Sequence, residues 1–181
     1  MSLAKYGFRN FYSFREGLEV SFILGPNCPQ TISEGRSFSN ILCIKSANGS
    51  GKTNALKALG FLSQFCTNSF SKKPDEKLDF DSHFSSKEAS FFFIEFEAND
   101  YSYRYELLTT VKKIKSEVLF RKKNRQTKVF ERKNNEIVFR INDYFELDMI
   151  KLRTNASIIS TANQYEISAT APVYKFFREI L

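Results

Sequence analysis

The residues with the clearest chemical potential lie in one short glycine-rich segment. It reads Asn48, Gly49, Ser50, Gly51, Lys52, Thr53 and Asn54. Because glycine accepts positive φ angles, Gly49 and Gly51 allow a turn tight enough to aim several backbone N–H groups at one anion. Lys52 is placed to reach the β and γ phosphates of a nucleotide, and the Thr53 hydroxyl is a suitable ligand for Mg²⁺. The segment therefore predicts a P-loop that binds ATP with Mg²⁺.

The elements on either side of this loop fit a phosphate site. The apolar run at residues 41–44 predicts a buried strand that leads into the loop. Apolar residues at helical spacing predict a helix over residues 52–66, whose N-terminus adds positive partial charge beside the phosphates. Ser46 stands where the full P-loop pattern begins with glycine. The alternative interpretation is a glycine-rich loop that only turns the chain.

The loop and an aromatic motif near the N-terminus together resemble one group of ATPases. The motif reads Asn10, Phe11, Tyr12, Ser13 and Phe14. Both segments are similar to the N-terminal part of ABC-type ATPases of the chromosome-maintenance and recombination-repair group. They are closest to the stand-alone OLD-like AAA ATPases of prokaryotic defence and abortive-infection systems. The resemblance spans most of the chain. We expect the three aromatic side chains to pack in the core, the alternative being that one of them stacks on adenine.

This resemblance implies a set of roles and partners. ATP would bind between the two heads of a head-to-head homodimer, and its hydrolysis would be linked to DNA or to a partner protein. Residues 48–53 would wrap the phosphates, with Lys52 as the phosphate lysine and Thr53 as the Mg²⁺ ligand. Gln164 matches the glutamine that senses the γ-phosphate in such heads, the alternative being an ordinary surface glutamine.

The apolar pattern predicts one mixed α/β domain, and the resemblance implies that this domain is a P-loop NTPase lobe like an ABC-type head. Its central sheet would combine strands over residues 5–14 and 18–24 with an antiparallel β-meander of about five strands. Asn134-Asn135 would form a hairpin turn in that meander. Helices are expected over residues 153–167 and from residue 173 to the end.

This pattern divides the chain into four successive parts of one partial ATPase domain. The expected parts are an N-terminal region of strands, P-loop and helix at 1–66, an exposed loop at 67–89, the β-meander at 90–141 and a helical C-terminal region at 142–181, which we expect to be cut short. The length of 181 residues fits one domain or one domain with a stub.

Composition narrows the class of protein further. Apolar residues make up 42% of the chain and include 20 Phe and 8 Tyr, which is ample for a core. Neither an apolar run of membrane-spanning length nor a secretory signal is evident. The three cysteines contain no Cys-x-x-Cys pair, which favours reduced structural thiols. We therefore expect a cytoplasmic protein without membrane contact. The single histidine, His83, is expected to be a loop residue.

Positive charge is concentrated late in the meander. Residues 111–140 hold eleven Lys or Arg and three Glu, a net charge of +8, whereas the remaining segments sum to −1. One interpretation is a face that contacts DNA or RNA, because clustered cations neutralise phosphates. The other is a solvated sheet edge whose lysines prevent aggregation.

Several motifs of a complete ATPase are missing from the sequence. No glycine follows Gly60, so an ABC-type signature loop cannot be placed, and no apolar strand ends in Asp-Glu. We therefore expect nucleotide binding with weak or no hydrolysis by this chain alone. An alternative is a nucleic-acid-binding module that uses the basic segment 111–140 and carries a degenerate P-loop. A small nucleotide kinase is disfavoured, because such enzymes usually carry the P-loop after their very first strand.

Overall fold

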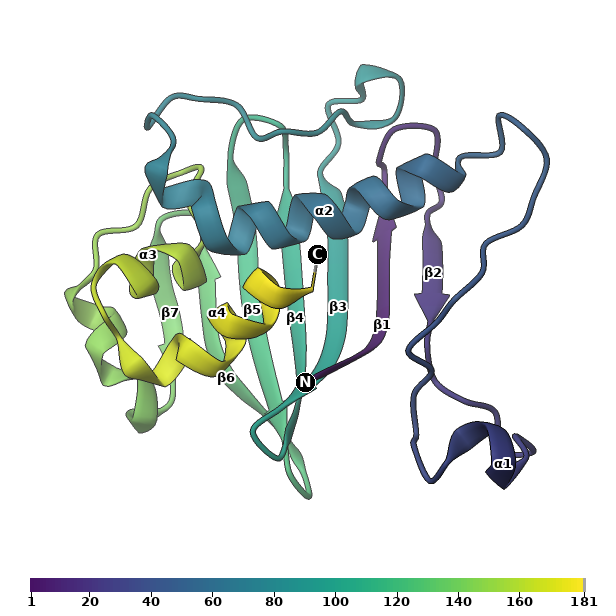
Figure 1. Cartoon of the computed structure of the whole chain (residues 1–181). Helices are drawn as coiled ribbons and strands as arrows, with labels where there is room; N and C mark the ends of the chain where they lie inside the picture. The colour runs from purple at the N-terminus through teal and green to yellow at the C-terminus, as the bar shows by residue number, and fades with distance from the viewer. Residues whose placement is uncertain (181) are drawn as a thin grey trace.

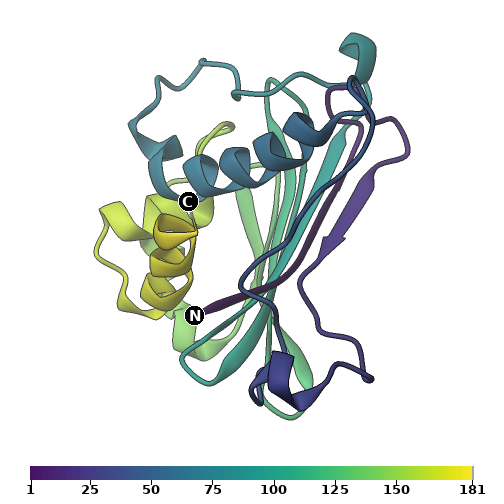
Figure 2. The ribbon, with the colours of Figure 1, turned by 45° about the vertical axis from the view of Figure 1, so that its right-hand side comes forward.

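A computed structural model describes residues 1–180. One antiparallel sheet of seven strands, in the order β2-β1-β3-β4-β5-β6-β7, forms one layer. The strands are β1 (Ser2–Arg9), β2 (Leu18–Ser21), β3 (Ser90–Ala98), β4 (Tyr101–Thr109), β5 (Ile114–Lys122), β6 (Gln126–Lys133) and β7 (Glu136–Arg140). Figures 1 and 2 show that helices cover one face of this sheet. The mixed α/β fold predicted from the sequence is confirmed.

The helices and helical turns connect and cover the sheet. The helices are α1 (Gln30–Ser33), α2 (Lys52–Asn68), α3 (Ile158–Gln164) and α4 (Ala171–Glu179). Short 3₁₀ turns lie at Ser69–Ser71, His83–Ser85, Asn142–Met149 and Ser168–Thr170. Within residues 1–180, no helix combines the length and the apolar character needed to cross a membrane.

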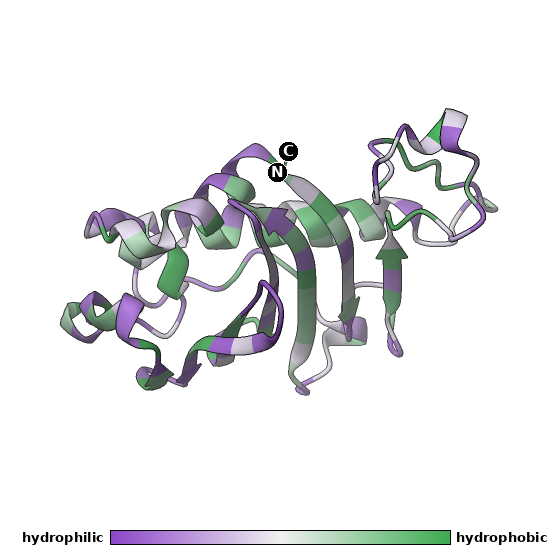
Figure 3. Cartoon of the chain, turned by 90° about the horizontal axis from the view of Figure 1, so that it is seen from below, coloured by the Kyte–Doolittle hydropathy of each residue, from purple (hydrophilic) through white to green (hydrophobic). Residues whose placement is uncertain are grey.

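The meander follows the predicted alternation of apolar and polar residues, which Figure 3 shows along the strands. In β3, Phe92, Ile94 and Phe96 are buried, and they pair in register with apolar residues of β4 that are buried as well. Because successive side chains of a strand point to opposite faces, this alternation places one row of each strand against the helices. Asn134 adopts a φ of 51° in the turn between β6 and β7, as its sequence predicts.

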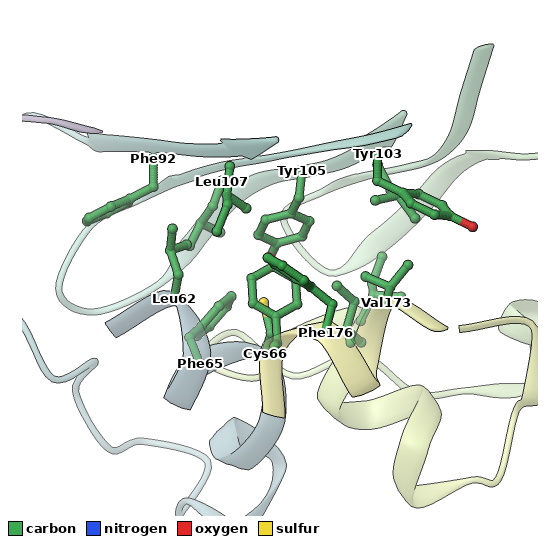
Figure 4. Packing of buried hydrophobic residues seen from close by; sticks show 14 of the residues in the cluster. Leu62, Phe65, Cys66, Phe92, Tyr103, Tyr105, Leu107, Val173 and Phe176 are labelled. Atoms are coloured by element: carbon green, nitrogen blue, oxygen red, sulfur yellow. The ribbon is translucent and has the colours of Figure 1, made fainter. Parts of the chain in front are cut away.

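Helices α2 and α4 supply the other half of the core. Buried residues of α2, among them Leu62, Phe65 and Cys66, face the sheet (Figure 4). Phe176 of α4 stacks on Phe96, with ring centroids 3.8 Å apart and planes 3° from parallel. The C-terminal helix is therefore an integral part of the core.

Several predicted element boundaries were wrong. The strand expected over 5–14 ends at Arg9, because Asn10 and Tyr12 adopt φ angles of 55° and 45°, which turn the chain. The strand expected over 18–24 ends at Ser21. The helix expected over 153–167 is only α3, which begins after Ser157, whose side chain accepts a hydrogen bond from the Ser160 amide as an N-cap.

Two further segments differ in environment from the prediction. The apolar run at 41–44 is neither a strand nor buried, and Ile41 is 82% exposed. No strand among residues 1–180 pairs with it through ladder hydrogen bonds. The loop 67–89 is not uniformly exposed, because Leu78 and Phe80 are 4% and 5% exposed and pack in the core.

A buried ion pair joins the sheet to the C-terminal segment. Glu117 on β5 and Arg132 on β6 are both completely buried, and Arg132 donates from one guanidinium nitrogen to a Glu117 oxygen at 3.4 Å. The Ile158 amide at the start of α3 and the Tyr105 hydroxyl donate to the same carboxylate, each at 3.0 Å. Arg132 also donates to the carbonyl of Ala156 at 2.7 Å. This network fixes α3 against the meander.

Candidate nucleotide-binding site

The glycine-rich loop adopts the curled backbone that its sequence predicts. Gly49 and Gly51 have φ angles of 81° and 93°, in the region that glycine reaches without steric cost. Helix α2 begins at Lys52, directly after this curl, and no side chain caps its N-terminus. Residues 41–50 are exposed, so the concave side of the loop is open to solvent. The loop therefore precedes the positive end of a long helix.

Position 51 requires glycine for a second reason. A Cβ atom there would lie 2.7 Å from the ring of Phe14 and 2.9 Å from the Ser13 hydroxyl oxygen. At Gly49, by contrast, nothing lies within 4 Å of such an atom, and only the positive φ favours glycine. The N-terminal aromatic motif therefore forms one wall of the loop.

Lys52 is held at the mouth of the loop. Its ammonium group donates hydrogen bonds to the carbonyl oxygens of Ser46 and Ala47, each at 2.8 Å. The loop therefore wraps around this positive charge. The Ser46 hydroxyl is hydrogen-bonded to the Ser50 hydroxyl. Ser46 is not among the residues with positive φ, so serine is accommodated at this position without backbone strain.

The first turn of α2 offers free hydrogen-bond donors. The amides of Asn54 and Ala55 both donate to the Gly51 carbonyl, at 2.9 and 3.1 Å. In the described part of the chain, the amides of Lys52 and Thr53 have no acceptor. Unsatisfied N–H groups at a helix N-terminus form a ready site for an anion. The Thr53 side chain is exposed beside them, so its hydroxyl is accessible to a metal ion.

The N-terminal motif contacts this site through residues that the sequence did not single out for it. The Asn54 side-chain amide donates to the Ser13 hydroxyl at 2.9 Å. The Lys57 ammonium lies 4.6 Å from the centroid of the Tyr12 ring. Phe11 is fully buried, as predicted, but Tyr12 and Phe14 are only partly buried. The spacing of about 40 residues gave no local signal for these contacts.

The 3₁₀ turn at His83–Ser85 supports the motif from the other side. The His83 amide donates to the Asn10 side-chain oxygen at 3.2 Å, and the His83 Nδ1 atom lies 3.0 Å from the Tyr12 carbonyl oxygen. Burial, with the nearby Asp81 and Asp79 carboxylates, raises the pKa of Tyr12. The single histidine is thus a loop residue that positions the motif.

Gln164 is not brought to the loop. It is exposed at the last position of α3. The same helix contacts the far end of α2, where the Ser160 hydroxyl donates to the Thr67 carbonyl at 3.1 Å. Because α2 has 17 residues, its two ends lie about 25 Å apart.

The basic segment 111–140 is divided by its ion pairs. Arg132 is buried, and four others pair with carboxylates: Arg121 with Asp143, Lys128 and Lys133 with Glu131, and Arg140 with Asp148. The six cations without an ion pair among residues 1–180 are Lys112, Lys113, Lys115, Lys122, Lys123 and Arg125. They gather at opposite ends of β5, about 26 Å apart. The segment is therefore not one continuous basic stripe.

Comparison with known proteins identifies a family that includes this loop and the helix after it. A sequence profile of one protein family, described as "AAA domain, putative AbiEii toxin, Type IV TA system", matches residues 47–181. That match covers roughly three quarters of the chain and begins inside the glycine-rich loop. The chain belongs to this AAA family. It is accordingly an AAA-family P-loop ATPase domain. No curated protein sequence matches the chain significantly.

Proposed function

We propose that this AAA-family chain binds ATP with Mg²⁺ at residues 48–54. The observation that carries the proposal is the arrangement around Lys52. Its ammonium group is held by two loop carbonyls at 2.8 Å, directly beside the Lys52 and Thr53 amides, which have no acceptor among residues 1–180. A curled loop, a cation and free helix N-terminal amides form a cradle for a polyphosphate.

Each residue of the cradle has a distinct task. Lys52 would exchange its two neutral carbonyl acceptors for β- and γ-phosphate oxygens, whose negative charge makes the hydrogen bonds to the ammonium group stronger. The loop residues from Asn48 to Ser50 would wrap the phosphates, and the Thr53 hydroxyl would ligate the metal. Mg²⁺ would be held by the Thr53 hydroxyl together with the nucleotide, and it would supply positive charge that offsets the phosphate charge. Asn54, bonded to Ser13, ties the cradle to the N-terminal motif.

The finer assignment is to the N-terminal lobe of an ABC-type, OLD-like ATPase of prokaryotic defence. Its support is the resemblance of the P-loop and of the residue 10–14 motif, which meet at Gly51. Such a lobe hydrolyses ATP when a second head closes over the nucleotide and stabilises the charge of the transition state. The exposed loop 41–50 leaves that side open for a head-to-head partner.

Replacing Gly51 with alanine tests the proposal. A left-handed backbone costs a residue with a Cβ atom about 1–2 kcal/mol, and this Cβ would also meet Phe14 at 2.7 Å. The loop must therefore shift, and we expect calorimetry to show ATP–Mg²⁺ affinity reduced about tenfold or more. Gly25→Ala is the matched control, because Gly25 has nothing within 4 Å of a Cβ atom and no positive φ. Wild-type affinity in the Gly51→Ala variant would refute the assigned loop.

A further inference from the structure

One exposed aromatic residue stands on a strained but well-fixed turn. Phe84 is 92% exposed and adopts a φ of 43°, and Ser85 follows with a φ of 56°. Such angles are unfavourable for residues with a Cβ atom and persist only where the surroundings impose them. Here the Ser82 hydroxyl donates to the Ser86 carbonyl at 2.7 Å, and the Ser86 amide donates to the His83 carbonyl at 2.9 Å. The turn therefore holds a large apolar ring in water.

A broad groove lies beside this turn. It has a volume of about 860 Å³ and runs between the residue 77–87 segment and the turn that joins β4 to β5. Ser82 and Ser85, on either side of Phe84, line it. Figure 1 shows both segments at the upper end of the sheet, above the strands. Phe84 does not itself line the groove, but it lies between two residues that do.

Lysines dominate the charge of the groove. Lys77, Lys87 and Lys112 line it, and none has an ion-pair partner within residues 1–180. Of the two acidic residues in the lining, Asp79 forms an ion pair with Lys72, whereas Asp81 has no ion-pair partner within residues 1–180, so three unpaired lysines line the groove against one unpaired carboxylate. The groove therefore presents unpaired positive charge next to an exposed aromatic ring.

We propose that this groove binds single-stranded nucleic acid, with Phe84 stacking on an unpaired base and the three lysines contacting phosphates. Aromatic rings combined with a cationic groove are the usual means of holding single strands without sequence preference, because every base has a face to stack. A duplex keeps its bases stacked on one another and cannot offer one to Phe84. The proposal concerns a site separate from the Lys52 cradle and does not depend on ATP binding.

The test is fluorescence anisotropy of the whole chain, without ATP, with labelled oligo(dT) and oligo(rU) of roughly 20 nucleotides. We expect Phe84→Ala to weaken binding about tenfold, since one stacked base accounts for that order of affinity. Because the Phe84 side chain is exposed, we expect the variant to fold as the wild type does, and an unchanged melting temperature verifies this. Whether DNA or RNA binds more tightly identifies the natural strand, and binding of either one supports the site.

The salt dependence of binding distinguishes phosphate contacts in the groove from a general attraction to a basic protein. Lys87→Ala/Lys112→Ala should reduce the slope of log affinity against log salt by about 1.4, because each phosphate contact on a single strand contributes about 0.7. Lys122→Ala/Lys123→Ala is the matched control, with equal charge loss at the opposite end of β5. Lys52→Ala should bind the oligonucleotides as tightly as the wild type does. The proposal would be overturned if the wild type did not bind the oligonucleotides or if Phe84→Ala left their affinity unchanged. It would also be overturned if the control variant lost as much salt dependence, or if a duplex of the same sequence bound equally well.

Discussion

Replacing Glu117 with alanine is expected to lower the free energy of unfolding by about 3–5 kcal/mol. Both Glu117 and Arg132 are completely buried, so removing the carboxylate leaves an uncompensated guanidinium charge inside the protein. The change also removes the acceptor of the Ile158 amide and of the Tyr105 hydroxyl. A buried donor without a partner is destabilising in its own right. The effect is therefore larger than for an ordinary cavity in the sheet.

Urea unfolding followed by circular dichroism measures this effect. Glu131→Ala is the matched control, because Glu131 on β6 pairs with Lys128 and Lys133 near solvent. Such a pair contributes about 0–1 kcal/mol. If Glu117→Ala does not fold, Glu117→Gln keeps the shape and should still lose well over 1 kcal/mol, because it removes the charge that Arg132 requires. Similar stabilities for the Glu117 and Glu131 variants would contradict the account of the buried network.

The second large effect concerns Lys52, the lysine that we propose contacts the phosphates. Lys52→Ala should weaken ATP–Mg²⁺ binding about ten- to a hundredfold, because a charge-assisted hydrogen bond contributes about 1.5–3 kcal/mol. The variant should remain folded, since the Lys52 ammonium contacts only the exposed carbonyls of Ser46 and Ala47. Isothermal titration calorimetry measures the affinity, and thermal unfolding verifies the fold.

Lys122→Ala serves as the control for charge alone. Lys122 lies at the end of β5, on the hairpin that Figure 1 places away from the N-terminus of α2. Its removal lowers the net charge as much as Lys52→Ala does but should leave ATP affinity within about twofold. An equal loss in both variants would mean that overall charge, and not a cradle at residues 48–54, governs binding.

The sequence predicted the parts of the fold that local patterns determine. Alternation in β3 and β4 placed Phe92, Ile94 and Phe96 on the buried face, and Asn134 formed the expected turn. The spacing of apolar residues in α2 predicted its length to within two residues. These features depend on neighbours one to four positions apart, which is why a single sequence reveals them.

Long-range pairing explains the predictions that failed. The run at 41–44 is apolar enough for a strand, but a strand needs a partner to pair with, and no strand pairs with this run within residues 1–180. Arg132 counts as a surface cation in the sequence, yet Glu117, Ala156 and Arg153 surround it in the structure. Burial of a charge depends on partners distant along the chain, so composition overestimates the basic surface.

In the candidate site, too, the local features could be predicted from the sequence and the long-range contacts could not. Residues 48–54 are contiguous, so their loop could be predicted as one unit from glycine spacing and the Lys-Thr pair. The wall formed by Ser13 and Phe14 could not, because only the folded sheet brings the residue 10–14 turn to Gly51. The motif was recognised, but its contact with the loop is tertiary.

Hydrogen–deuterium exchange with and without ATP–Mg²⁺ tests the central claim most directly. The Lys52 and Thr53 amides have no acceptor among residues 1–180 and lie in an exposed loop–helix junction, so they should exchange quickly in the free chain. Bound phosphate would accept hydrogen bonds from these amides. We therefore expect ATP–Mg²⁺ to slow exchange in peptides covering residues 46–56 and 10–14, and to leave exchange at the β5–β6 hairpin unchanged. Protection that appears elsewhere while residues 46–56 remain unchanged would contradict the assignment of this loop as the nucleotide site.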